Sequence, residues 1–153
     1  NEYDWLYSSH DSSLWSADKK SVNDPCPRGW RVPAGDVFTA FDIDELEDIA
    51  QLGDVKNMYG WHLVDRTTGV KMFMPGAGRR SFENGVLTNL NNYGDDYNPM
   101  PWIGYYWTAG TAGNKSTSLF FDLNTTRAVN NNYEPQKEMY RANGMQLRCI
   151  REK

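Results

Sequence analysis

The sequence predicts an α+β fold made mainly of short antiparallel strands, with one helical region and long polar loops. Two observations predict this class. Short apolar runs lie in pairs around turn residues between positions 61 and 123. Apolar residues recur at helical spacing after Asp36. The only two cysteines, Cys26 and Cys149, lie near the two ends of the chain, where a bond between them would close nearly the whole fold.

Length and composition fit one globular domain. The chain has 153 residues, of which 39% are hydrophobic and 14% aromatic, so it has enough apolar surface to build a core. The net charge is −4 and no basic run occurs, which argues against nucleic acid as a partner. No apolar run approaches the ~18 residues of a membrane-spanning helix. We therefore expect a single domain over 1–153, with residues 1–14 as an N-terminal extension or a linker from a larger parent protein.

The first predicted element is a helix that begins at Asp36 and ends near Gly53. Asp36 suits an N-cap, and Gly53 suits the end of a helix. Between them, apolar residues follow at roughly helical spacing, at Phe38, Phe41, Leu46 and Ile49. Acidic residues on the other side predict a solvated helix face: Asp42, Asp44, Glu45, Glu47 and Asp48.

Three hairpins are predicted after the helix. Residues 61–64 and 70–74 flank the turn 65–69, and residues 104–110 and 117–123 flank the small-residue loop 111–116. Residues 79–82 and 86–90 flank 83–85, where the pair Asn84-Gly85 suits a type I′ turn. A last strand is predicted over 145–152.

The two cysteines favour a disulfide over a redox pair or a metal site. No CxxC spacing is present, and no cluster of metal ligands surrounds His10 or His62. Pro25 and Pro27 restrict the backbone on both sides of Cys26. Two buried, unpaired cysteines remain the alternative. A disulfide would indicate an oxidising compartment such as the periplasm, the cell surface or the medium.

Two long polar segments, 89–102 and 128–144, are predicted to be surface loops because both are rich in Asn, Tyr, Asp, Gly and Pro. Long structured loops often carry function, and Tyr, Trp and Asn suit adaptable recognition. The alternative is that they are only solvated connections. Trp102 either is exposed, where its ring can stack on the apolar face of a sugar, or closes its loop onto the domain. The candidate ligand-binding residues are Tyr93, Asp95, Asp96, Tyr97, Asn98, Trp102, Asn130, Asn131, Asn132 and Tyr133.

Four motifs together resemble those of a known family. They are "DPCPRGWRVP", "FMPGAGRRSFENGVL", "GYYWTAG" and "NGMQLRCIRE", in this order along the chain. The chain thereby resembles the Fibrobacter succinogenes major paralogous domain from about Trp15 to Arg151. It departs from the family's usual pattern at Thr108-Ala109, in "LRCIR", and in "GDDYNPMPW", which has no clear family counterpart.

The resemblance implies a C-type lectin-like fold whose termini meet in one sheet. It also implies that the cysteine of the first motif pairs with that of the last, here Cys26 with Cys149. Members of the family occur in cell-surface proteins of Bacteroidetes, in some cases at the C-terminus of fimbrillin-like proteins. Within the matching motifs we expect Trp30 and Trp107 to be core residues. We expect the neighbouring Arg31 and Arg148 to hydrogen-bond backbone carbonyls.

The expected function is that of a non-catalytic, secreted or cell-surface adhesive module that binds a glycan or a host or bacterial protein through its long loops. One alternative is a structural tip or cap module that docks to fimbrial subunits. Another is a hypervariable receptor diversified by a retroelement, because "VNNNYEPQ" is Asn- and Tyr-rich shortly before the last strand.

Catalysis and metal binding have less support in the sequence. The superfold includes formylglycine-generating enzymes, which need reactive cysteines and a metal, whereas both cysteines here are assigned to the disulfide. Asp95 and Asp96 are the one carboxylate pair considered for acid–base work, and adjacent acids in a loop seldom do it. No enzyme and no cofactor are therefore expected. Calcium is the alternative, because segments 94–99 and 130–138 supply oxygen ligands and Glu134-Pro135-Gln136 resembles the Glu-Pro-Asn tripeptide that binds calcium and sugar in C-type lectins.

Overall fold

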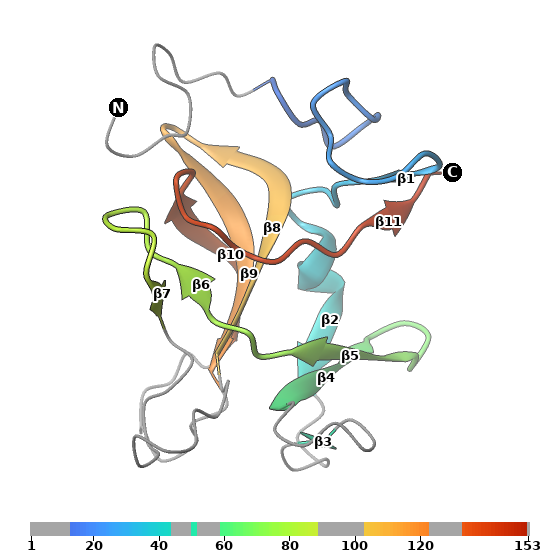
Figure 1. The fold of residues 1–153 in the computed structure, drawn as a ribbon. Helices are drawn as coiled ribbons and strands as arrows, with labels where there is room; N and C mark the ends of the chain where they lie inside the picture. Colours follow the sequence, from blue (N-terminus) through green and yellow to red (C-terminus); the bar gives the residue numbers. More distant parts are fainter. Residues whose placement is uncertain (1–12, 44–49, 52–58, 89–102, 123–132, 153) are drawn as a thin grey trace.

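Antiparallel β-sheets make up most of the fold in the computed structural model (Figure 1), which describes residues 13–43, 50–51, 59–88, 103–122 and 133–152. The elements in chain order are β1 (Trp30–Arg31), the 3-10 helix η1 (Val37–Ala40), β2 (Phe41–Ile43), β3 (Ala50–Gln51), β4 (Tyr59–Asp65), β5 (Lys71–Pro75), β6 (Arg79–Arg80), β7 (Leu87–Thr88), β8 (Ile103–Ala112), β9 (Lys115–Asp122), β10 (Tyr133–Tyr140) and β11 (Ile150–Arg151). No helix in the described part of the chain is long and apolar enough to cross a membrane.

The hairpin predicted around 65–69 is confirmed, and its first strand, β4, is the central strand of a four-stranded sheet. Strand β4 pairs with β5 from Gly60↔Pro75 to Val64↔Lys71, and its other edge pairs with β2 and β3. Asp65 organises the turn, because its carboxylate accepts hydrogen bonds from the Thr67 and Thr68 amides at 2.9 and 2.7 Å. The same hydrogen bonds, with that from the Thr68 hydroxyl, lower the pKa of Asp65.

The hairpin predicted around 111–116 is also confirmed. Strands β8 and β9 pair down to Ala112↔Lys115, with an irregularity between Trp107 and Thr111. Strand β10 then extends the sheet to the order β10-β9-β8. This corrects the prediction that all of 128–144 is a loop: residues 133–140 form an edge strand with a bulge between Glu134 and Lys137. An edge strand needs partners on one side only, so it tolerates the proline at 135.

The third predicted hairpin is present, but its turn is longer than expected. Strands β6 and β7 pair at Arg79↔Thr88 and Arg80↔Leu87. The Ser81 amide donates to Val86 O, and the Gly85 amide donates back to Ser81 O, both at 2.9 Å. Gly85 has φ +70°, a conformation that favours glycine. The type I′ turn expected at Asn84-Gly85 is therefore wrong, because the loop closes at Ser81 and Val86.

The hydrophobic core joins the two larger sheets. From the four-stranded sheet it takes Trp61, Leu63 and Met74, from β8 and β9 it takes Tyr106, Leu119 and Phe121, and η1 adds Phe38. The Phe121 ring stacks on Trp61 across the sheets, with ring centroids 5.9 Å apart and an interplanar angle of 20°. Trp107 is buried as predicted, on β8.

The predicted helix over 36–53 is not present in its described part, and no helix of seven or more residues occurs there or elsewhere in the described chain. The rings of Phe38 and Phe41 do contact each other and pack against the core, as a helix would place them. A single 3-10 turn, η1, produces this arrangement. At Phe41 the chain becomes β2, because pairing with Leu63–Asp65 satisfies its backbone. The Asp42 carboxylate is paired with Arg66 at 2.5 Å, which lowers the pKa of Asp42. Leu46, Ile49 and Gly53 lie outside the described residues.

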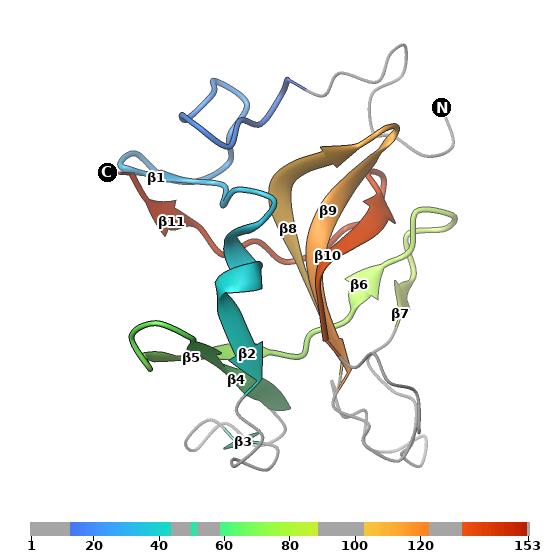
Figure 2. The same ribbon diagram turned by 180° about the vertical axis from the view of Figure 1, so that it is seen from behind.

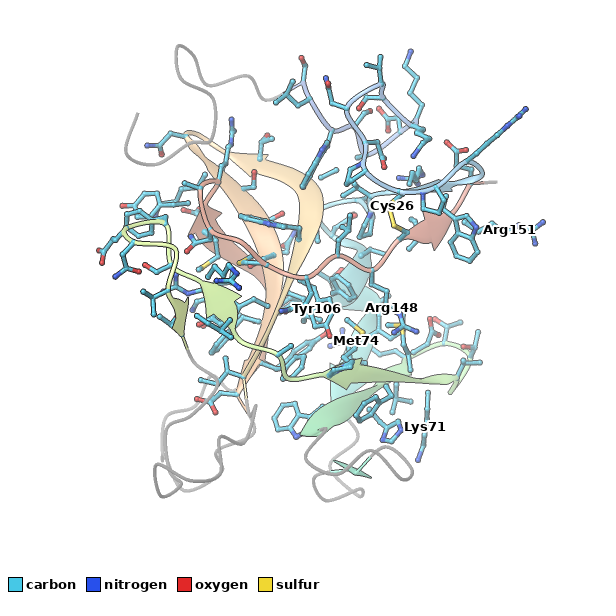
Figure 3. The ribbon with its side chains drawn as sticks, viewed as in Figure 1. Cys26, Lys71, Met74, Tyr106, Arg148 and Arg151 are labelled. Carbon is cyan, nitrogen blue, oxygen red and sulfur yellow. A yellow bond between two sulfur atoms is a disulfide. The ribbon has the colours of Figure 1, made fainter. Side chains whose placement is uncertain are left out.

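The two ends of the described chain meet as predicted. Cys26 and Cys149 form a disulfide with their Cα atoms 5.9 Å apart, and β1 pairs with β11 at Trp30↔Arg151 and Arg31↔Ile150. Figure 3 shows the disulfide beside β11. Arg31 donates to Ala17 O, and Arg148 donates to Phe73 O at 3.3 Å, so both arginines hydrogen-bond backbone carbonyls as expected.

Trp30 differs from its prediction as a core residue, because 44% of its surface is exposed. Its strand belongs to a ribbon of only two strands, which can bury one face and leave the other in solvent. Only the residues after it enter the core: Val32 is completely buried.

The carboxylate of Asp24 holds the segment that leads into the disulfide. One oxygen accepts hydrogen bonds from the Cys26 amide at 2.8 Å and from Lys20 Nζ at 3.1 Å, and the other accepts from the Val32 amide at 2.9 Å. The side chain is fully buried. Burial by itself would raise the pKa of Asp24, but the amides of Val32 and Cys26 and the Lys20 ammonium outweigh it and lower the pKa below its ordinary value.

We expect Asp24→Asn to lower the free energy of unfolding by roughly 1.5–3 kcal/mol at neutral pH, because an amide cannot accept all three hydrogen bonds. The folded pKa of Asp24 is depressed, so its stabilising effect is complete above the unfolded value of about 3.9 and disappears as the pH falls through the folded value. Urea unfolding of both proteins from pH 7 to pH 2 should therefore converge at low pH. Asp18→Asn, at an exposed position of the same segment, is the control. A difference that stays constant with pH would contradict this role.

Candidate functional site

Segments 89–102 and 123–132, which contain all the predicted recognition residues except Tyr133, have their flanking residues at one end of the molecule. Segment 89–102 runs from β7 to β8, and segment 123–132 runs from β9 to β10. Their flanking residues are neighbours, since Ile103 pairs with Asp122 and Tyr133 pairs with Phe121. We call Thr88, Ile103, Asp122 and Tyr133 the loop roots.

The fourth loop root, Thr88, is connected to the others through β6. Thr88 pairs with Arg79, and the preceding Gly78 donates its amide to Ile103 O at 2.7 Å. Both ribbon views show the start of β8, the end of β9 and the start of β10 well away from the β1–β11 ribbon (Figures 1 and 2). The loop roots and the disulfide thus occupy different ends of the fold.

Two contacting aromatic rings with a cation at each end form a row across β6 and the three-stranded sheet, next to the loop roots. Arg79 lies over the Tyr105 ring at 5.7 Å, Tyr105 contacts Phe120 with centroids 5.1 Å apart, and Lys137 Nζ lies 4.4 Å from the Phe120 centroid. These four residues, the aromatic–cation row, come from β6, β8, β9 and β10 in turn. Such contacts each stabilise by about 0.5–1.5 kcal/mol. The row therefore ties β8, β9 and β10, which carry three of the loop roots, to β6, the strand that pairs with β7.

Tyr133 is the one candidate ligand-binding residue that the structure describes. Its ring packs against the core cluster, and its hydroxyl donates to Phe38 O at 2.8 Å. Burial raises the pKa of this hydroxyl, Asp42 raises it further and Arg66 opposes the change, so the group remains a neutral donor at ordinary pH. The contacts assign Tyr133 a structural task at the loop root; its part in ligand binding stays a prediction.

The other candidates lie outside the described residues. They are Tyr93, Asp95, Asp96, Tyr97, Asn98, Trp102, Asn130, Asn131 and Asn132. The structure brings together the ends of the two segments that contain them. The part of these nine residues in ligand binding stays a prediction.

The segment 134–136, compared above with a calcium- and sugar-binding tripeptide, lies on strand β10. The Glu134 carboxylate pairs with Lys137 Nζ at 2.7 Å, and Gln136 donates to Gly35 O at 3.3 Å. Both polar side chains thus have partners within the protein. Over the described ranges, no three His, Cys, Asp or Glu residues are grouped so that they could hold a metal ion.

Sequence reasoning missed the aromatic–cation row. The signal was present in "GYYW" and "LFFD", where adjacent aromatic residues on a strand must point to opposite faces. Tyr106 and Phe121 face the core, so Tyr105 and Phe120 must occupy the second face. The positions of Arg79 and Lys137 depend on how the other strands pair, which no local pattern reveals.

No family model matches the chain, and neither the curated proteins nor the solved structures contain a significant match.

Proposed function

We propose that this domain is a non-catalytic binding module of a bacterial cell surface, related to the Fibrobacter succinogenes major paralogous domain and to C-type lectin-like folds. It recognises a glycan or a surface protein through segments 89–102 and 123–132. The observation that carries the proposal is the convergence of the four loop roots at one end of the sheet. Two segments rooted side by side can contribute to a single surface, which is how rigid scaffolds usually present binding loops.

Three further observations support the proposal. The aromatic–cation row and the Tyr133–Phe38 hydrogen bond fix the loop roots, and rigid presentation lowers the ordering cost of binding. The disulfide agrees, weakly, with an extracellular location. The composition of the two segments, rich in Asn, Tyr and Asp, suits polar recognition.

A glycan array probed with the purified domain tests the proposal. We expect binding to a restricted set of glycans, and we expect Trp102→Ala to weaken the affinity by roughly 30-fold, since a central aromatic anchor contributes ~2 kcal/mol. The melting temperature of this variant should change little. Val70→Ala, which truncates an exposed apolar side chain on the β4–β5 hairpin, is the control.

Tyr133→Ala does not suit this test, because its ring packs against the core and its loss would lower stability directly. Binding that survives Trp102→Ala unchanged would exclude Trp102 from the site. No glycan signal, together with co-assembly with fimbrial subunits, would replace the proposal with a structural docking role. A large loss of stability in Trp102→Ala would assign that residue to the core.

A further inference from the structure

An exposed indole lies at the disulfide end of the molecule, away from the loop roots. Trp30 has 44% of its surface exposed, and its cross-strand partner on β11 is Arg151, which is also exposed. Directly opposed residues on an antiparallel pair project from the same face with their Cβ atoms about 5 Å apart. Figure 3 shows Arg151 at the outer edge of the molecule, beside the β1–β11 ribbon. An aromatic ring and a guanidinium are therefore presented together to solvent.

The backbone under Trp30 is held from several sides. Its amide donates to Pro27 O at 3.0 Å, and Lys20 Nζ donates to its carbonyl oxygen at 3.0 Å. The Glu152 amide donates to Gly29 O at 3.0 Å, which closes the ribbon on the other side. The disulfide joins the two flanking segments covalently. The ring is thus presented on a fixed backbone, and a ligand would not have to order it.

The charge at this end is opposite to that of the whole protein. Residues 13–33 and 150–152 contain five Lys or Arg and three Asp or Glu, whereas the complete chain contains 16 and 20. Lys20 is committed to the buried Asp24, and Arg31 donates to a backbone carbonyl. Arg28 and Arg151 are exposed, and no carboxylate within the described ranges forms an ion pair with either. Arg151 thus lies across the strand pair from Trp30, Arg28 precedes Trp30 by two residues, and within the described ranges neither guanidinium has a carboxylate partner.

We propose that Trp30, Arg151 and Arg28 form a binding subsite for an acidic saccharide that carries carboxylate or sulfate groups. The flat indole face would stack on the apolar CH face of a sugar ring, as aromatic rings do with polarised or positive groups. The planar guanidinium groups match the paired oxygens of a carboxylate or sulfate. This subsite is separate from the loops of the proposed function and does not depend on them.

Two other kinds of partner fit this surface less well. A peptide added as a further strand needs a long free edge, whereas β1 and β11 are two residues each. Anchoring in a lipid surface needs a broad apolar face, whereas the ribbon presents one indole opposite Arg151. A single sugar unit or two is the size of ligand that one ring and two cations can contact.

Heparin, polygalacturonate, dextran and poly-glutamate are the probes for this subsite, titrated against the full chain by fluorescence anisotropy. We expect heparin, polygalacturonate or both to bind at low salt and to weaken at high salt, and we expect no binding of neutral dextran. Trp30→Ala should weaken binding by about tenfold or more, and Trp30→Phe should restore part of it. Arg151→Gln and Arg28→Gln should each weaken it several-fold.

Lys71→Gln is the matched charge control, because Lys71 is an exposed cation on β5 that lies far from Arg151 (Figure 3). Equal weakening by Lys71→Gln and Arg151→Gln would show attraction by net charge only and would overturn the proposal. Absence of binding to both acidic polysaccharides would also overturn it. Poly-glutamate that binds as tightly, with no effect of Trp30→Ala, would assign the surface to acidic peptides instead. Circular dichroism of each variant separates a lost contact from a lost fold.

Discussion

Phe121→Ala is expected to lower the free energy of unfolding by about 3–5 kcal/mol, which is typical of a fully buried phenylalanine. The Phe121 side chain has no exposed surface, and its ring stacks on Trp61 of the four-stranded sheet while also lying 6.4 Å from the Tyr106 ring of β8. Truncation would leave a cavity at the point where the two larger sheets meet. Urea unfolding followed by tryptophan fluorescence measures the effect.

Gly104 provides a matched partner for this measurement. It lies opposite Phe121 in the β8–β9 pair, and a side chain placed there would overlap the Phe121 ring. Gly104→Ala should therefore cost about 1–3 kcal/mol in the natural protein and less in the Phe121→Ala background, where the added methyl group enters the cavity. A purely additive double mutant, or a loss below ~1 kcal/mol for Phe121→Ala, would contradict the contact described here.

Removal of the disulfide by Cys26→Ser with Cys149→Ser is expected to have an effect of similar size. The bond closes a loop of 123 residues, which in the chain-entropy model stabilises the fold by about 5 kcal/mol through its constraint on the unfolded chain. Only two residue pairs join β1 to β11, so few other contacts hold the ends together. The oxidised natural protein and the double variant should be compared by equilibrium unfolding in guanidinium chloride.

Hydrogen exchange adds a test of location. In the double serine variant the amides of Trp30, Val32 and Glu152 should exchange faster than in the oxidised natural protein. Under native conditions the amides of Leu119 and Phe121 in the core should keep nearly the same protection from exchange in both proteins. Natural protein treated with a reductant should behave like the variant. Equal unfolding midpoints for the oxidised protein and the variant would show that the bond contributes nothing to stability.

The sequence predicted the paired strands of the hairpins better than it predicted the segment between Asp36 and Ile43, where a helix was expected. A hairpin depends on residues that are close in the sequence, so it can be predicted from a local pattern. Gly69 and Gly113, which have positive φ, lie in the turns between the paired strands. The disulfide and the meeting of the ends also followed from the motifs around Cys26 and Cys149. The helix prediction failed because spacing of three residues between Phe38 and Phe41 fits one 3-10 turn as well as a long helix. Pairing with β4, a tertiary contact, decided between them.

Burial was harder to predict than pairing. Trp30 and Trp107 both stand in apolar motifs, yet Trp107 lies on a strand between partners, whereas Trp30 lies on a two-stranded ribbon with one face in solvent. The segments of the candidate site could be predicted from composition, because their Asn-, Tyr- and Asp-rich stretches are evident in the sequence. That their ends converge follows from the order β10-β9-β8 and from the Gly78–Ile103 hydrogen bond, which are long-range contacts.

The covalent link between Cys26 and Cys149 also determines how the fold would carry mechanical tension. A force that pulls the chain before Cys26 away from the chain after Cys149 would pass through the sulfur–sulfur bond. It would not act on the strands from β1 to β10, which lie between the two cysteines. The 123-residue separation corresponds to roughly 400 Å of extended chain, and this length stays inaccessible to the force while the bond is intact. The two larger sheets and the loop roots would keep their arrangement under load, so a ligand bound at the loop roots would contact a domain that the force does not stretch.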